Sequence, residues 1–209
     1  MPRKKLLNPI DQRFVLLQDS TRFTDCKNCP LLVERNNSGI VPPELIEGST
    51  HKVLIVGEAP GRQERKKHRP FIGPAGQVLR TAMERIEAVL GMEVSWVVAN
   101  VIQCFPRTAD NPDRFRIPTV NEARCCQGSL LHLLEQYRPP LMFLLGQVPQ
   151  FYVQRIRPSS KHWPARTFPL YHPSYILRRG GINSPTGQQW LTTFIHNLET
   201  ANKDGLLVP

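Results

Sequence analysis

The chain is 209 residues long and 40% of them are hydrophobic, which suits a single domain with a substantial buried core. Its formal net charge of +10 favours a polyanionic partner, nucleic acid before a membrane surface. No apolar run approaches the roughly 18 residues of a membrane span, and no apolar core of a secretion signal follows the basic residues 1–5, so we expect no membrane segment and an intracellular protein.

Apolar runs predict the strands of a parallel sheet. They occupy residues 52–56, 95–101, 140–145 and 167–171. Runs that are apolar on both faces and separated by helical segments are typical of strands covered by helices on both sides. Pro169 places the last run at an edge of the sheet. We therefore expect an α/β fold, a three-layer α/β/α sandwich around a central, mostly parallel four-stranded sheet.

The remaining segments read as helices and loops of one domain spanning 1–209. A helical stripe of apolar residues runs from residue 75 to residue 90 and is closed by Gly91, and a second stripe covers 190–198. Thr119 and Glu122 have the spacing of a capping box that opens a further helix. Residues 105–117 read as a long loop. We expect residues 1–25 to be an N-terminal extension and 202–209 a C-terminal tail.

Polar motifs follow three of the predicted strands. They are the glycine- and proline-rich stretch 57–76, the tetrapeptide 99–102 and the stretch 171–178. Because ligands of open α/β folds bind at the carboxyl ends of the strands, these loops should converge on one crevice. An acid (Glu58), an aromatic ring (Phe71), an amide (Asn100) and an imidazole (His172) would meet there.

The cysteines have the character of metal ligands. In a reducing compartment the pair Cys26-x-x-Cys29 favours metal or redox chemistry over a disulfide, and further ligands are needed to complete a site. Cys104 is one candidate. Of the adjacent pair, Cys126 shares the apolar face of its predicted helix and is a better ligand than Cys125. Spacing alone leaves zinc and an iron–sulfur cluster open.

From Cys26 to Arg178, the order and spacing of these motifs resemble the family 4 uracil-DNA glycosylases, the iron–sulfur branch of that superfamily. The resemblance implies the same sandwich fold and a DNA glycosylase that extrudes uracil and excises it by hydrolysis, leaving an abasic site for base-excision repair. It also implies a structural [4Fe–4S] cluster, with zinc as the less expected occupant. The implied ligands are Cys26, Cys29, Cys104 and Cys126.

The resemblance and the chemistry of excision together suggest roles for the polar residues. His172 would donate a hydrogen bond to the developing oxyanion at uracil O2, and Glu58 would hold or activate water. Asn100 can accept from uracil N3–H and donate to O4, while Phe71 stacks on the base. The remaining candidates are Ala59, Gly61 and Glu64 at the substrate, and Arg65, Lys66, Lys67, Ser174 and Arg178 at DNA.

Two departures from the family pattern keep an alternative open. Residues 65–68 are basic where the family has an acid and a glycine, and the 105–117 loop is longer than usual. The alternative is a weak or inactive DNA-binding or assembly subunit that retains the cluster, with a protein partner at this loop or at the N-terminal extension. A branch that traps DNA through a histidine after the third metal ligand is disfavoured, because 105–118 contains no histidine.

Overall fold

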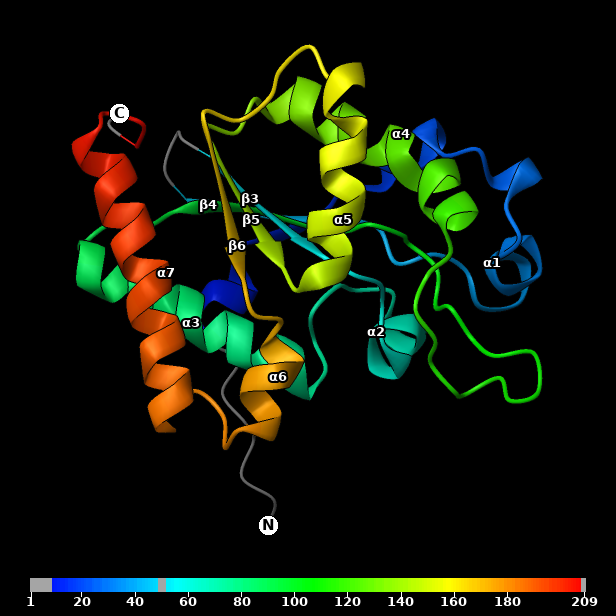
Figure 1. Cartoon of the computed structure of the whole chain (residues 1–209), viewed down its shortest axis with the longest axis horizontal. Coiled ribbons are helices and arrows are strands. Elements are labelled where there is room, and N and C mark those ends of the chain that lie inside the picture. The colour runs from blue at the N-terminus through cyan, green and yellow to red at the C-terminus, as the bar shows by residue number, and fades with distance from the viewer. Residues whose placement is uncertain (1–8, 49–51, 208–209) are drawn as a thin grey trace.

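The computed structural model describes residues 9–48 and 52–207, whose strands form one six-stranded sheet (Figure 1). The strands are β1 (Phe14–Leu16), β2 (Glu44–Ile46), β3 (Lys52–Gly57), β4 (Ser95–Asn100), β5 (Leu141–Leu145) and β6 (Arg166–Leu170). Their order is β1-β2-β4-β3-β5-β6, and the β4-β3-β5-β6 part is parallel. The predicted sandwich is confirmed, including β6 as an edge strand, but the predicted count of four strands is wrong.

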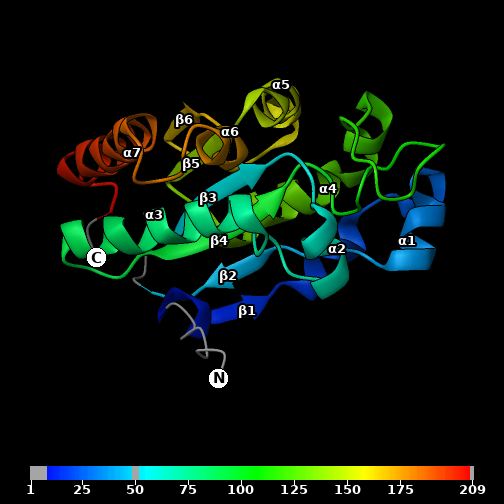
Figure 2. The same cartoon turned by 90° about the horizontal axis from the view of Figure 1, so that it is seen from below.

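The two unpredicted strands extend the sheet beyond β4 (Figure 2). Both pair antiparallel and are three residues long, too short to produce a periodic pattern. β1 lies in the segment expected to be an extension, and the neighbouring Ile10 is buried in the core. Residues 9–25 are therefore part of the folded domain, while 1–8 lie outside the described residues.

Helices cover both faces of the sheet (Figure 1). One face carries α3 (Pro74–Leu90), α6 (Pro173–Arg178) and α7 (Pro185–Lys203). The other carries α4 (Val120–Tyr137) and α5 (Gln147–Ile156). Two short helices, α1 (Leu32–Ser38) and α2 (Arg62–Lys67), and 3-10 turns at Pro9–Gln12, Gln18–Phe23, Cys26–Asn28 and Arg157–Ser159 complete the chain between residues 9 and 207.

Local sequence signals set the ends of the main helices. Gly91 ends α3 at a φ of 63°, and both bonds of the capping box are present at α4, where Glu122 N donates to Thr119 Oγ1 and Thr119 N donates to Glu122 Oε2. Helix α7 begins before the predicted stripe, at a Ser184 cap. Among the described helices, none combines the length and the apolar character needed to cross a bilayer.

The order of the parallel strands places the functional edge. The central strand β3 pairs with β4 on one side and with β5 on the other. Strands that follow β3 in the chain therefore lie on both sides of it. The loops that leave the carboxyl ends of these neighbouring strands run in different directions and leave a crevice between them. The predicted polar motifs lie in these loops.

Candidate active site

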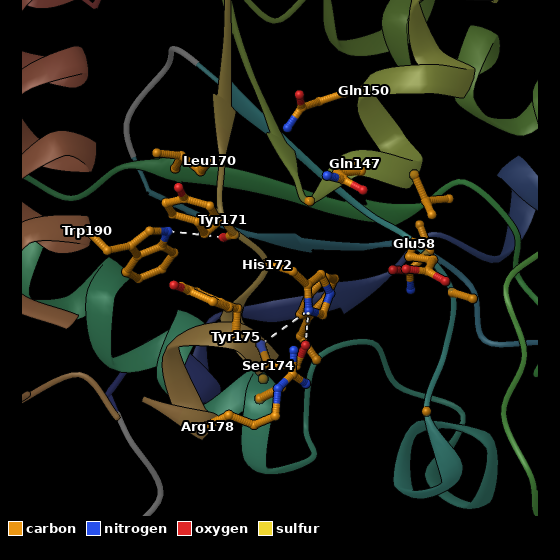
Figure 3. Close-up of a pocket in the computed structure, with 18 of the residues that line it drawn as sticks. Glu58, Gln147, Gln150, Leu170, Tyr171, His172, Ser174, Tyr175, Arg178 and Trp190 are labelled. Carbon is orange, nitrogen blue, oxygen red and sulfur yellow. Dashed lines mark hydrogen bonds between the residues drawn. The ribbon is translucent and has the colours of Figure 1, made fainter. Parts of the chain in front are cut away.

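A cavity of about 1280 Å³ lies at this edge of the sheet. It collects side chains from the segments after β3, β4 and β6, as the sequence predicts. The predicted site residues that line it are Glu58, Ala59, Gly61, Glu64, Phe71, Asn100, His172, Ser174 and Arg178. In Figure 3, His172, Ser174 and Arg178 form one side and Glu58 stands on the other.

Gly57 makes the close approach of Phe71 and Asn100 possible. It ends β3 and lies opposite Asn100 of β4. A Cβ atom at Gly57 would lie 2.4 Å from Phe71 Cζ and 2.6 Å from Asn100 Oδ1. Only glycine leaves room for both side chains here, so the Phe71 ring and the Asn100 carboxamide lie next to each other at the base of the cavity.

The backbone of Phe71 has an unusual conformation, with a φ of 50°. This left-handed region is unfavourable for a bulky residue and needs support from its surroundings. Arg80 supplies it, because its Nε donates to Phe71 O and its guanidinium donates to Pro70 O, both at 2.9 Å. The buried guanidinium is itself paired with Glu44 and Asp11.

His172 has a defined tautomer and a low basicity. Its Nδ1 accepts from the backbone N–H of Ser174 at 3.2 Å and lies 2.8 Å from Ser174 Oγ (Figure 3). Because Nδ1 is an acceptor, the proton of the neutral ring resides on Nε2. Burial and the charge of Arg178 lower the pKa of His172 to about 4. The imidazole is therefore a neutral N–H donor at physiological pH.

Glu58 is a carboxylate with an unused acceptor. Its Oε1 is buried and has no hydrogen-bond partner among the described residues. Burial raises the pKa of this carboxyl above its ordinary value. An unpaired buried carboxylate oxygen is costly, which indicates a site for a water molecule or a ligand donor.

Glu64 lines the cavity but its carboxylate is engaged with the loop. Oε1 accepts from Ile72 N at 3.0 Å and from Gly73 N at 2.7 Å. A Cβ at Gly61 would lie 2.6 Å from Glu64 Oε2, so a larger residue there would displace this carboxylate oxygen. Glu64 therefore holds in place the segment that presents Phe71.

The basic residues after Glu64 differ in their surroundings. Arg65 is paired within the protein, with Asp113 at 2.6 Å and Glu34 at 3.4 Å, and it lies over the Phe105 ring. Lys66 and Lys67 are exposed, as is Arg178 at the end of α6. Since the guanidinium of Arg65 is occupied, we retain a DNA-contact role only for the exposed cations.

The thiols of four cysteines, from three separate segments, lie close enough to influence one another. The Cys104 thiol interacts electrostatically with those of Cys126, Cys26 and Cys29. Burial raises the pKa of Cys29 to about 11 and that of Cys126 to about 12. Cys126 packs on the apolar face of α4, as predicted, but Cys125 is also buried and its thiol interacts with that of Cys29.

The surroundings of these sulfurs suit thiolate ligands. The backbone N–H of Leu31 donates to Cys29 and that of Gln103 to Cys126, while the Thr24 hydroxyl lies 3.0 Å from Cys26 Sγ. Hydrogen bonds to cysteine sulfur stabilise thiolates and tune iron–sulfur sites. Across residues 9–48 and 52–207, no group of three or more His, Cys, Asp or Glu side chains has an arrangement suited to a metal ion.

Several residues at the cavity were missed by sequence reasoning. Phe115 and Ile117 of the long loop line it, and so do Gln147 and Gln150 of α5 and Trp190 of α7. Single apolar residues in a loop and glutamines on a helix have no local pattern that marks a site. Arg80 is buried as well, and nothing in the helix pattern of α3 reveals its buried partners.

Comparisons with known proteins identify the family of the chain from its sequence. The family model of the uracil DNA glycosylase superfamily matches residues 45–198. A type-4 uracil-DNA glycosylase of Thermotoga maritima is 31% identical, over 76% of this chain and 81% of the relative, and one of Sulfurisphaera tokodaii is 30% identical, over 73% and 71%. The crystal structure of Pedobacter heparinus SMUG2 aligns with a TM-score of 0.45 and 14% identity, over 73% of this chain and 76% of that one. By the extent of the family match and the identity to these relatives, the chain belongs to the uracil DNA glycosylase superfamily and, within it, to the type-4 enzymes.

Proposed function

We propose that the protein extrudes uracil from DNA and hydrolyses its N-glycosidic bond, leaving an abasic site for base-excision repair. The observation that carries the proposal is the pairing of a neutral imidazole donor, His172, with the unpartnered carboxylate of Glu58 across one cavity. Breaking the C1′–N1 bond places negative charge on uracil and positive charge on the sugar, so a donor and a carboxylate are the groups required.

Recognition of the base is assigned to the floor of the cavity. Phe71 stacks on the extruded ring, and Asn100 accepts from N3–H and donates to O4. Cytosine presents an acceptor and a donor at these two positions, the opposite pattern. The support is the contact of both side chains with Gly57, which holds the carboxamide beside the ring.

In the chemical step, His172 and Glu58 act from opposite sides of the cavity. Nε2–H of His172 donates to O2 as the bonding electrons pass to uracil, and no proton transfer from the ring is needed, since a neutral donor suffices. Water held by Glu58 attacks C1′ and gives its proton to the carboxylate. The products are an abasic sugar and the uracil anion, which takes up a proton from solvent after release, while Glu58 returns its proton to solvent.

DNA binding is assigned to cations around the cavity. Lys66, Lys67 and Arg178 are exposed and would contact phosphates, and Ser174, on the same side of the cavity as Arg178 (Figure 3), would add a hydrogen bond. The net charge of +10 favours such a partner.

We assign a [4Fe–4S] cluster to Cys26, Cys29, Cys104 and Cys126. Bound there, it would cross-link the N-terminal segment to α4 and to the segment after β4; the excision chemistry does not pass through it. The N–H donors to sulfur support a thiolate site. Zinc also binds four thiolates but is the less expected occupant, because the order and spacing of the motifs resemble the iron–sulfur branch of the superfamily.

A uracil-containing oligonucleotide tests the proposal directly. Alkali should cleave it after incubation with the protein, while thymine and cytosine controls stay intact. His172→Ala should slow excision by roughly 10²–10³-fold, the usual cost of removing one oxyanion donor, with DNA affinity nearly unchanged. His196→Ala, at an exposed histidine of α7, is the matched control. Absence of excision by the parent protein would support the non-catalytic alternative instead.

A further inference from the structure

A second, smaller cavity lies between α4 and α5, which cover the same face of the sheet (Figure 1). Its volume is about 210 Å³, and none of the residues that line it also lines the active-site cavity. Sites that enclose a whole small ligand usually measure roughly 300–1,000 Å³. The cavity between α4 and α5 is therefore better suited to a single side chain of a larger partner.

Aliphatic side chains form most of the wall of this cavity. Six of the ten residues that line it are aliphatic, and none of these described residues is acidic. Leu130, Val153 and Ile156 are buried and belong to the core on this face of the sheet, whereas Val120 is 49% exposed. The cavity therefore runs from the core to the surface. Covering such apolar surface removes it from water and favours the binding of a partner.

Each of the two helices contributes an arginine to this cavity. Arg124 belongs to α4 and Arg155 to α5, and both are exposed. The Arg155 guanidinium lies over the Phe151 ring, 3.4 Å from its centroid, and donates to Phe151 O. In the described part of the chain neither arginine forms an ion pair, and Glu122, in the first turn of α4, pairs with Arg116 instead. Two cations without a counter-charge therefore flank an apolar cavity.

These features define the chemistry of the occupant. Guanidinium groups bind carboxylates through paired hydrogen bonds, and an apolar pocket at a protein interface accepts a single aromatic or large aliphatic side chain. A DNA phosphate would match the arginines but would leave the apolar cavity unfilled. A second copy of the chain carries the same net charge of +10, which opposes self-association. An acidic segment of another protein meets both the charge and the apolar requirement.

We propose that the groove between α4 and α5 docks an acidic segment of a partner protein. The segment seats one aromatic or large aliphatic side chain in the cavity and pairs its carboxylates with Arg124 and Arg155. Because this groove and the active-site cavity have no lining residue in common, the partner and DNA can be bound at the same time. The docking surface goes beyond the excision of uracil and does not depend on it.

A fluorescein-labelled peptide tests the docking by fluorescence anisotropy. It carries one phenylalanine flanked on each side by aspartates and serines. The parent protein should bind it, and affinity should fall about tenfold when alanine replaces the phenylalanine or asparagines replace the aspartates. Arg124→Glu and Arg155→Glu should each weaken binding about tenfold, whereas Arg138→Glu, at the exposed end of α4, should change it less than about twofold. Val120→Ala should weaken binding about threefold and Val89→Ala, on α3, should not.

Other occupants of the groove give different results. Equal binding of the phenylalanine and alanine peptides, or no binding by the parent protein, overturns the proposal. Displacement of the peptide by a uracil-free duplex, together with weaker duplex binding in Arg124→Glu, would make the groove a DNA contact. A dimer in light scattering that Arg124→Glu dissociates would assign the groove to a second copy. Excision from a free uracil oligonucleotide should be unchanged in Arg124→Glu, so a failure here is separate from a failure of the proposed function.

Discussion

At the scale of single residues, burial acts on Glu58 and His172 in opposite directions. It raises the pKa of the carboxyl and lowers that of the imidazole, because it disfavours the charged form of each. His172 therefore stays neutral down to about pH 4, and the acid side of the activity profile belongs to Glu58. This separation assigns the two roles of water activation and oxyanion donation.

The pH profile of the single-turnover rate should follow Glu58. The carboxylate must be ionised to accept the proton of water, so the rate should fall as the pH drops through its raised pKa, above the ordinary value of about 4.5. Glu58→Gln should lower the plateau and flatten this acid limb. A limb of unchanged midpoint in Glu58→Gln would assign the titration to another group.

Asn100→Asp tests how the base is read. A carboxylate still accepts from N3–H but repels O4, so uracil excision should fall further than in Asn100→Ala, where both uracil groups merely lose a partner. Cytosine, which offers a donor in place of O4, should gain trace cleavage. Excision rates on matched uracil and cytosine oligonucleotides measure both effects, and parental uracil activity in Asn100→Asp would remove Asn100 from recognition.

At the scale of elements, Arg80 joins α3 to the loop that carries Phe71. The guanidinium is buried, binds two carbonyls of that loop, and pairs with Glu44 of β2 and with Asp11. Arg69 of the same loop also binds Glu44 and Asp11. The unpredicted strand β2 thereby takes part in positioning the stacking ring.

Substitution of Arg80 should release the loop that carries Phe71 from α3 and β2. Arg80→Gln leaves Arg69 as the remaining cation beside Glu44 and Asp11 and removes donors from Phe71 O and Pro70 O, so it should lower the free energy of unfolding by about 3 kcal/mol. Arg80→Lys keeps the charge but cannot bind both carbonyls and the acids together. Compared with Arg80→Gln, it should therefore regain part of the lost stability, while its KM for uracil-containing DNA stays raised above that of the parent protein. Denaturant unfolding and steady-state kinetics measure the two, with Arg13→Gln, at another ion-paired arginine, as control. Unchanged KM in Arg80→Lys would confine Arg80 to stability.

The sequence predicts those elements that have long uniform patterns. The apolar runs of β3, β4 and β5 and the helical stripe of α3 each span several repeats, so their type and approximate ends are evident. The short strands β1 and β2 exist because of long-range pairing, which no local pattern records.

The same limit applies within the site. Glu58, Phe71, Asn100 and His172 could be picked out because they lie in motifs that begin where predicted strands end, and the cavity does collect them. The left-handed backbone of Phe71 and the pairing of Arg65 with Asp113 depend on neighbours distant in sequence, so they could not be predicted.

At the scale of the whole molecule, the proposed [4Fe–4S] cluster would tie together segments far apart in the chain. Cys26 and Cys29 belong to the N-terminal region, Cys104 follows β4, and Cys126 lies in α4. The buried Glu34 adds a second tie, because it binds Arg65 and Arg107. If the cluster binds as proposed, its removal should therefore loosen the N-terminal region and the 105–117 loop together.

Individual cysteine variants test the ligand set. Alanine at Cys26, Cys29, Cys104 or Cys126 should each lose iron, acid-labile sulfide and visible absorption and should lower thermal stability. Cys125→Ala is the control and should retain the metal. Loss of iron from Cys125→Ala with retention in Cys126→Ala would reverse the assignment on α4, and stoichiometric zinc in the parent protein would replace the cluster.

The two outer strands of the sheet make poor templates for self-association. β1 is only three residues long, and β6 contains Pro169, which lacks a backbone N–H. A further strand from another molecule would therefore find few aligned donors and acceptors at either border. The architecture discourages edge-to-edge polymerisation, so we expect concentrated protein to resist fibril formation as long as the sheet stays folded.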